Sequence, residues 1–242
     1  MRSALVLVLL TSAVVLAACG NDTAPTASPA PTIDFAAEAR RLVGDAVFSA
    51  EDLPGFAPLG ADNLQSQVDL SDQCDVFDPA VIFPDAVATA DSGAYADALD
   101  DQLVNLAGIY RTAEDASASL ARTREIRDRC EDEFEVAVET VARDFLADLG
   151  IDLGLFSTIT VAITDYDPTA VGEEITGYRM HVNVNLVITS QQYNLHAIVV
   201  REGRVAGALL YGRFGPPDDI AETELLRLMA GKLSAVNASL PE

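Results

Sequence analysis

Residues 175–212 read ITGYRMHVNVNLVITSQQYNLHAIVVREGRVAGALLYG and carry the clearest strand pattern in the chain. Through residues 175–189 apolar and polar side chains alternate, which is the period of a β-strand with one buried face. Two further apolar runs, 195–201 and 204–212, are joined by Glu202-Gly203, and such a spacing predicts a β-hairpin. Residues 157–164 are also rich in β-branched side chains. The second half of the chain therefore predicts an antiparallel sheet of hairpin-linked strands.

Helical periodicity flanks these strands. Helices are predicted at 35–47, 113–130 and 134–148, with a last one opening at Pro216-Pro217-Asp218-Asp219. One stripe of the second helix, about 120° wide, holds its apolar and small residues. Its members are Ala116, Leu120, Thr123, Ile126 and Cys130. Helices before and after hairpin-linked strands predict an α+β fold: a single domain with a twisted antiparallel sheet and helices packed mainly on one face.

The first residues have the features of a bacterial export signal. Arg2 precedes an apolar run at 4–16, which is too short for the roughly 20 residues of a spanning helix. The run ends in Leu16-Ala17-Ala18-Cys19, and small residues directly before a cysteine resemble a lipobox. We therefore predict a lipoprotein signal peptide at 1–18 and lipidation of Cys19. The alternative is an ordinary signal peptide or N-terminal membrane helix with an incidental cysteine.

Residues 19–34 contain three prolines among Ala, Thr and Ser, and almost no large apolar side chain. Such a segment cannot form a core, so we expect an extended tether of up to about 45 Å before a domain at 35–242. A lipoprotein cysteine carries at least two acyl chains, which suffice for stable anchoring. The expected location is the extracytoplasmic side of the cell membrane, held there through Cys19.

The chain is strongly acidic, with 38 Asp and Glu against 15 Lys and Arg and a formal net charge of −23. This charge repels phosphates and argues against a nucleic-acid partner. It fits binding of cations or neutral ligands, but solubility alone also explains it. Lys232 is the single lysine, and the arginine and alanine bias is associated with high-GC actinobacterial genomes.

With Cys19 lipidated, Cys74 and Cys130 remain as a pair. Two cysteines in an oxidising compartment predict a disulfide, which would stabilise the fold by roughly 4 kcal/mol for a loop of this length. A redox or metal role is the alternative. Neither a CxxC spacing nor a neighbouring histidine supports it.

The best candidate ligand-binding residues are four polar side chains on the predicted strands: His181, Asn183, Asn185 and His196. With a two-residue turn at Ser190-Gln191, His196 would pair with Asn185, and all four side chains would lie on one face of the sheet. A one-residue change of register would move His196 to the other face. They could form the polar floor of a binding cleft. The alternative is a solvated sheet face with one packed histidine.

No metal, cofactor or catalytic site is expected. Aspartates recur at every third position in the segment 69–78, as Asp69, Asp72, Asp75 and Asp78. Their spacing differs from a calcium-binding EF-hand loop, so a solvated acidic loop is the preferred interpretation over a cation site. The sequence contains no GxSxG, HExxH, GxxxxGK[ST] or GxGxxG motif. No particular carboxylate pair is marked for glycoside hydrolysis.

Four segments together resemble the PknH-like extracellular sensor domain, which is found on a mycobacterial kinase and on many actinobacterial lipoproteins. They are EDLPGF at 51–56, YRTAEDA at 110–116, VGEEITGYR at 171–179 and VVREGRV at 199–205. The resemblance implies a cleft-bearing α+β domain for an unidentified extracellular ligand. The kinase sensor carries two disulfides, whereas this chain has cysteines for one and no kinase domain.

The expected function is therefore a non-enzymatic ligand-binding or sensing lipoprotein. Its ligand would be a small or cell-wall-derived compound, and any sensing would pass through an envelope protein partner. A cell-envelope hydrolase or transferase and a scaffold or accessory subunit of an envelope complex are the alternatives.

Overall fold

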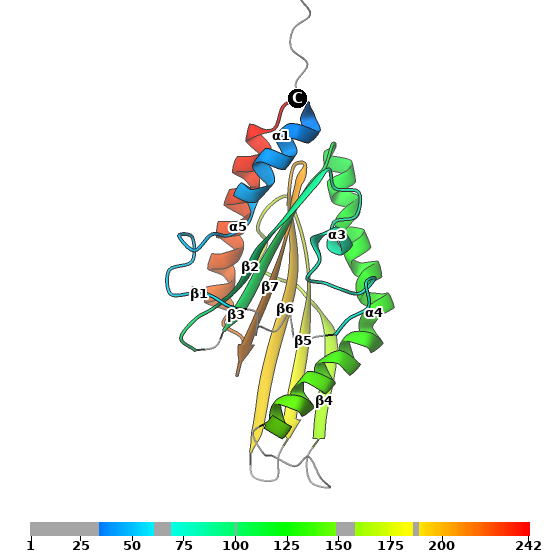
Figure 1. The fold of residues 1–242 in the computed structure, drawn as a ribbon, viewed down its shortest axis with the longest axis vertical. Helices are drawn as coiled ribbons and strands as arrows, with labels where there is room; N and C mark the ends of the chain where they lie inside the picture. Colours follow the sequence, from blue (N-terminus) through cyan, green and yellow to red (C-terminus); the bar gives the residue numbers. More distant parts are fainter. Residues whose placement is uncertain (1–33, 61–68, 100, 149–157, 186–188) are drawn as a thin grey trace, which may run out of the picture. The chain divides into compact units, whose positions relative to one another are not determined.

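One antiparallel sheet organises the domain, with the strand order β1-β2-β3-β7-β6-β5-β4 (Figure 1). The computed structural model describes residues 34–60, 69–99, 101–148, 158–185 and 189–242. The strands are β1 (Ala57–Pro58), β2 (Ala88–Ala96), β3 (Gln102–Ile109), β4 (Thr158–Tyr166), β5 (Glu174–Asn185), β6 (Ser190–Glu202) and β7 (Val205–Phe214). The helices are α1 (Phe35–Leu42), the 3-10 helix η1 (Val43–Ala46), α3 (Pro79–Ile82), α4 (Ala113–Asp148) and α5 (Asp219–Ser239). The predicted α+β fold class is confirmed.

The sheet and its helices form one compact unit that runs from Ile33 to Glu242. The predicted signal peptide at 1–18, Cys19 and the tether as far as residue 33 lie outside the described residues. Asp34 comes first and caps α1, because its Oδ1 accepts hydrogen bonds from the backbone N–H groups of Ala36 and Ala37 at 3.0 and 3.3 Å. Within the described ranges, no helix has both the length and the apolar character needed to cross a membrane.

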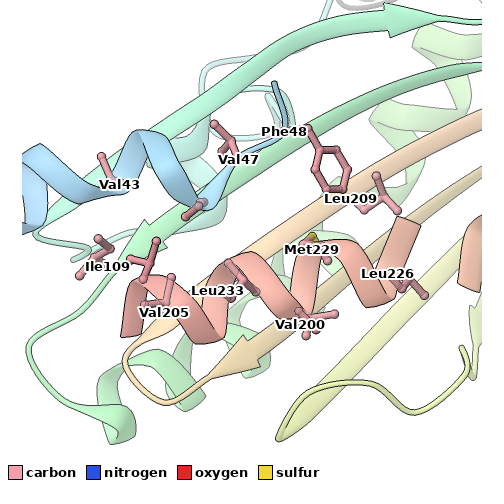
Figure 2. Packing of buried hydrophobic residues seen from close by; sticks show 14 of the residues in the cluster. Val43, Val47, Phe48, Ile109, Val200, Val205, Leu209, Leu226, Met229 and Leu233 are labelled. Atoms are coloured by element: carbon pink, nitrogen blue, oxygen red, sulfur yellow. The ribbon is translucent and has the colours of Figure 1, made fainter. Parts of the chain in front are cut away.

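One face of the sheet packs against α5, α1 and η1. In Figure 2, Leu226, Met229 and Leu233 of α5 point into this core. The strand side of the core comes from β3, β6 and β7 through Ile109, Val200, Val205 and Leu209. Each fully buried side chain of this size contributes about 1.5–3 kcal/mol to folding. This core fixes α5 over β6 and β7.

The opposite face packs against α4, with α3 beside it. The predicted apolar stripe of α4 is buried as expected and contacts two clusters of strand side chains, one over β3, β6 and β7 and one over β4 and β5. Because α5 lies on one face and α4 on the other, the prediction that the helices pack mainly on one face is wrong. Strands β3 and β7 are buried on both faces, so their sequences lack the alternation that marks a sheet with one solvated side.

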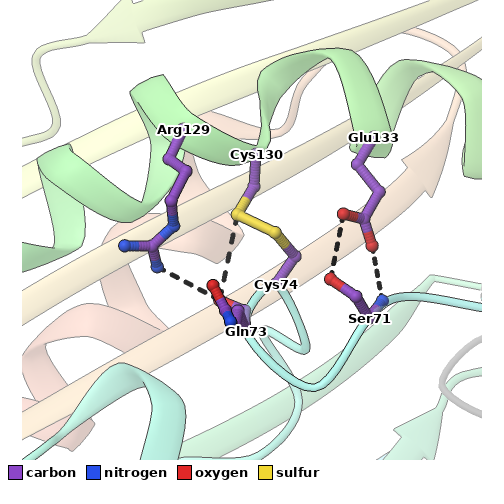
Figure 3. The surroundings of a disulfide bond; sticks show 6 residues. All are labelled: Ser71, Gln73, Cys74, Arg129, Cys130 and Glu133. Carbon is purple, nitrogen blue, oxygen red and sulfur yellow. Dashed lines mark hydrogen bonds between the residues drawn. A yellow bond between two sulfur atoms is a disulfide. The ribbon is translucent and has the colours of Figure 1, made fainter.

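The predicted disulfide between Cys74 and Cys130 is present, and it joins the loop before α3 to α4 (Figure 3). The two Cα atoms are 5.7 Å apart and both side chains are buried. Beside the bridge, Glu133 accepts hydrogen bonds from the backbone N–H and the hydroxyl of Ser71. Arg129 donates a hydrogen bond to the carbonyl oxygen of Gln73 at 3.2 Å. Together these contacts attach the loop to the middle of α4.

Two predicted boundaries differ from the structure. Helix α4 is continuous from Ala113 to Asp148, because the intervening Glu131-Asp132-Glu133 contains neither glycine nor proline to end it. In the β6–β7 hairpin, Glu202 pairs with Val205, so the two turn residues are Gly203 and Arg204. Gly203 has a φ of +57°, which glycine adopts without steric cost.

Candidate functional site

Strands β4, β5 and β6 continue past the end of β7 and form an arm of the sheet. Phe214, the last residue of β7, pairs with Tyr193, so residues 190–192 of β6 extend beyond it. One face of the arm packs on Ile126, Cys130 and Phe134 of α4. On the other face, α5 begins at Asp219, near the level of His196, and Figure 1 shows it beside the other end of the sheet. The second face of the arm therefore lies beyond the reach of α5.

Three cross-strand rows of side chains make up this surface, which we call the open face. The rows are Ala162–His181–Asn194, Thr160–Asn183–Gln192 and Thr158–Asn185–Ser190. Six of the nine residues are exposed, while His181 and Asn183 are half-buried and Asn194 is buried. None of the nine is an acidic or basic side chain with a fixed charge, although the whole chain carries 38 acidic residues. The open face is thus a neutral hydrogen-bonding surface on an acidic protein.

The four residues predicted from the sequence all lie on this side of the sheet. His181, Asn183 and Asn185 belong to the open face, and His196 follows Asn194 along β6 toward α5. The predicted pairing of His196 with Asn185 is wrong, because His196 pairs with Arg179 and Asn185 pairs with Ser190. The shift is an even number of residues, so it moves the pairing along the strand without changing the face. A turn at Ser190-Gln191 is excluded, since both residues belong to β6.

His196 is the centre of a buried polar cluster at the edge of the open face. Its Nδ1 contacts Oε2 of Glu222, which lies in the first turn of α5. On the other side of the ring, Nε2 accepts a hydrogen bond of 2.7 Å from Nε of Arg179. The side chains of His196 and Glu222 are only 3% and 2% exposed. This cluster joins β5 and β6 to the start of α5.

Tyr166, at the end of β4, completes the cluster. Its hydroxyl donates a 2.6 Å hydrogen bond to Oε1 of Glu222, so the carboxylate is bound on both oxygens. Burial, and then the bond to Glu222, raise the pKa of the Tyr166 hydroxyl and keep it protonated. The guanidinium carbon of Arg179 lies 4.2 Å from the centre of the Tyr166 ring, a cation–π contact.

These bonds define what His196 can do chemically. Because Nε2 accepts from Arg179, the neutral imidazole carries its proton on Nδ1 and donates it to Glu222. Both ring nitrogens are therefore occupied by partners inside the protein. The arrangement positions Arg179 and α5, and it leaves His196 without a free nitrogen for acid–base catalysis.

His181 is the open-face histidine with an available nitrogen. Its Nδ1 donates to Oδ1 of Asn194, because an amide oxygen can only accept. Asn194 in turn donates through Nδ2 to the carbonyl oxygen of Gly215 at 2.6 Å. Nε2 of the neutral His181 ring is then an acceptor. The buried Asn194 thus fixes the orientation of a half-buried histidine on β5, the central strand of the open face.

Sequence reasoning missed several residues of this region. The alternation in β6 could have added Gln192 and Asn194 to the predicted face, since they follow the same period as His196. The roles of Arg179, Tyr166 and Glu222 could not be predicted in this way. They come from three elements that are brought together only by tertiary packing.

The acidic segment 69–78 forms local contacts. Asp75 accepts from the backbone N–H of Phe77 at 2.9 Å, and Asp78 caps α3 by accepting from Ala80 at 2.8 Å. Among the residues that the structure describes, no three His, Cys, Asp or Glu side chains are grouped as metal ligands. Turn and cap formation explains these two aspartates.

A small apolar cavity lies on the α4 side of the sheet, away from the open face. It has a volume of about 10 Å³, about enough for one water molecule. Its lining includes Phe77, Val104, Tyr193 and Leu210. A space that admits about one water molecule is too small for an organic ligand unless its lining moves.

Comparison with known proteins gives a weak structural likeness. No protein-family model matches the sequence, and no curated protein matches it. Among solved structures, the extracellular domain of PknH from Mycobacterium tuberculosis has a TM-score of 0.36 and 9% sequence identity to this chain. The match covers 66% of this chain and 70% of that one. The chain is thus weakly similar to the same kind of domain that its sequence motifs resemble, and the likeness is too low to support an argument about function.

Proposed function

We propose that this chain is a lipid-anchored extracytoplasmic protein whose domain binds a neutral, hydrogen-bonding ligand on the open face. The ligand site is supported by one observation: three paired strands present nine uncharged residues on the open face. The opposite face of the same strands packs on α4, which the Cys74–Cys130 bridge joins to the loop before α3. The anchor is supported by the sequence of Arg2, the apolar run at 4–16 and the small residues directly before Cys19. The domain would act as a binding or sensing module, and a partner protein of the cell envelope would respond to its ligand-bound form.

The chemistry of the open face favours a ligand rich in hydroxyl and amide groups. Hydroxyl, amide and imidazole groups both donate and accept, so they suit a carbohydrate-like ligand from the cell wall. A cation would find no carboxylate among the nine residues. Of the two arginines beside them, Arg179 binds His196 through Nε and lies over the Tyr166 ring, and Arg213 forms ion pairs with Asp101 and Asp218. Burying neutral groups also costs less than burying charges, provided that hydrogen bonds replace those to water.

Binding is preferred over catalysis because of the contacts of the two histidines. Both nitrogens of His196 have protein partners, and Nδ1 of His181 is held by Asn194. His181 keeps one acceptor nitrogen, which can receive a hydrogen bond from a ligand hydroxyl. This arrangement orients a binding group, whereas a hydrolase would place a histidine or carboxylate beside a nucleophile.

The test is a binding experiment on the full chain in detergent. Cell-wall fragments released by glycan hydrolases would be separated into neutral, anionic and cationic fractions, and each would be added during hydrogen–deuterium exchange. We expect the neutral fraction to slow exchange in residues 158–162, 181–185 and 190–194. The Asn183→Asp/Asn185→Asp variant should bind at least 10-fold more weakly, because it adds two charges to a neutral face. Protection confined to α4 or produced only by the anionic fraction would sink the proposal.

A further inference from the structure

The two edges of the sheet are built very differently. At one edge, β1 has only two residues and ends in Pro58, and the next strand β2 has a bulge between Asp91 and Ala94. Short strands, proline and bulges are the devices that prevent an edge from pairing with another chain. At the other edge, β4 has nine residues, all paired in an unbroken register with β5. None of the protective devices of the first edge is present in β4.

The sequence of β4 also lacks the charges that usually protect an edge. Thr158–Tyr166 reads TITVAITDY and contains no proline, glycine, lysine or arginine. Its one charged residue is Asp165, whose carboxylate lies 2.8 Å from the guanidinium of Arg127. No described strand pairs with the outer side of β4. A long, regular and nearly uncharged edge is a template for strand addition.

We propose that two copies of the chain pair through β4, antiparallel and about a twofold axis at Ala162. Ala162 is the middle of the nine residues, so this register is the one that pairs the whole strand with its copy. It places Thr160 opposite Thr164 and Val161 opposite Ile163, which are favourable cross-strand pairs. Asp165 falls opposite Ile159, so no like charges meet. The strand is therefore complementary to itself, as a twofold interface requires.

This pairing joins the two open faces. An antiparallel continuation of a sheet has its twofold axis perpendicular to the sheet, so both copies present the same face on the same side. The polar rows of β6, β5 and β4 would continue into those of the second copy, and each copy would supply half of one surface. This consequence rests on the proposed binding function of the open face, whereas the pairing itself does not. Such a surface suits a polymer that is longer than one arm.

Net charge opposes this association and makes it dependent on salt. Each chain carries a formal charge of −23, so two copies repel at low ionic strength. Screening by salt weakens this repulsion but leaves the backbone hydrogen bonds of the edge largely unaffected. The paired fraction should therefore rise with salt, in contrast to a complex held by surface ion pairs.

The test is disulfide cross-linking of the full-length chain in detergent. In the proposed register residue 162 lies opposite itself, so the Ala162→Cys variant should form a covalent dimer on mild oxidation. The matched control is Thr164→Cys, on the same strand and face, where the two copies of residue 164 are about 13 Å apart along the strands. We expect at least five times more cross-linked dimer from A162C than from T164C, and more at 500 mM than at 50 mM salt.

Three other outcomes would refute the proposed β4 dimer. Equal cross-linking of the two variants would show random collision, and cross-linking of A162C to a different protein would show another occupant of the edge. Absence of a covalent dimer from A162C, together with a monomeric wild-type chain in sedimentation at all protein concentrations, would exclude a β4 dimer. The experiment needs no ligand, so a chain that binds cell-wall fragments as a monomer would refute the dimer and leave the proposed function intact.

Discussion

His196 of β6 and Glu222 of α5 meet in the interior, where the imidazole Nδ1 contacts the Glu222 carboxylate and neither side chain is more than 3% exposed. Arg179 on the other side of the imidazole supplies a positive charge that compensates the buried carboxylate. The contact sets where α5 begins over the sheet, and that beginning is the boundary of the open face.

Removal of the Glu222 carboxylate should be strongly destabilising. The Glu222→Ala variant leaves His196 Nδ1 and the Tyr166 hydroxyl without their shared acceptor, and it removes the negative charge that faces Arg179 across the imidazole. We therefore expect a loss of about 3 kcal/mol in the free energy of unfolding. Urea titration of the variant against the wild type measures this loss. Glu224→Ala, an exposed glutamate two residues later, should change the free energy by less than about 0.5 kcal/mol. Similar values for both variants would show that the buried contact contributes little.

A half-buried ion pair, between Asp52 and Lys232, makes the stability depend on pH. Burial alone would raise the pKa of Asp52, but hydrogen bonds from Lys232 and Ser49 lower it to about 2. The Lys232 Nζ atom lies 2.8 Å from the Asp52 carboxylate. Because the folded pKa is below the ordinary value of 3.8, the contact is stabilising above about pH 4 and is lost as pH falls toward 2.

The Lys232→Met variant tests this contact while it keeps the apolar stem of the side chain. At pH 7 the variant should be less stable than the wild type by up to about 2 kcal/mol, and the difference should shrink between pH 4 and pH 2. Unfolding free energies measured across this range give the result. A difference that stays constant down to pH 2 would contradict the assignment, because it would not depend on the charge of Asp52.

The disulfide should contribute through the loop that it closes. Cys74 and Cys130 are 56 residues apart, so the Cys74→Ser/Cys130→Ser variant should be less stable by about 4 kcal/mol in the chain-entropy account. Thermal unfolding with and without a reducing agent measures the effect. Reductant should lower the stability of the wild type toward that of the variant and leave the variant unchanged. A wild-type chain insensitive to complete reduction would contradict this prediction.

Lipidation can be tested separately from the fold. A bacterial host fed with an alkyne-tagged palmitate should label the wild-type chain, which should then partition into the detergent phase of a Triton X-114 extraction. The Cys19→Ser variant should lose both properties, because the acceptor thiol is absent. The Cys74→Ser/Cys130→Ser variant should keep the label, since those two cysteines form the disulfide. Labelling that survives in Cys19→Ser would exclude the proposed anchor.

The sequence predicted the parts of the fold that have a simple period. The hairpins of β5, β6 and β7 and the buried stripe of α4 follow from alternation and helical spacing. Strands β2 and β3 were not predicted, because four of the nine residues of β2 are alanine, with an aspartate and a glycine among the rest, and β3 is buried on both faces. The residues of β2 have a weak intrinsic preference for β-structure, and the sequence of β3 lacks the alternation of apolar and polar residues.

In the candidate site too, the residues that follow strand alternation could be predicted, and those brought in by tertiary packing could not. The shared face of His181 and His196 was predictable because strand parity survives an even shift of register. The buried position of Glu222 was not, since an acidic residue in the first turn of a helix is equally compatible with an exposed position. Only the packing of α5 against β6 brings Glu222 to His196.

If the open face binds a neutral ligand, that ligand should be found by mass spectrometry of compounds that co-purify with the chain from its native membrane. The wild type would be compared with Asn183→Asp/Asn185→Asp on the open face. An Ala121→Asp/Thr140→Asp control adds the same two charges at exposed positions of α4. We predict an uncharged, hydroxyl- or amide-rich compound that co-purifies with the wild type and the control and is at least 10-fold depleted from the open-face variant. A compound retained equally by all three proteins, or one that is anionic, would show that the open face does not bind a neutral ligand.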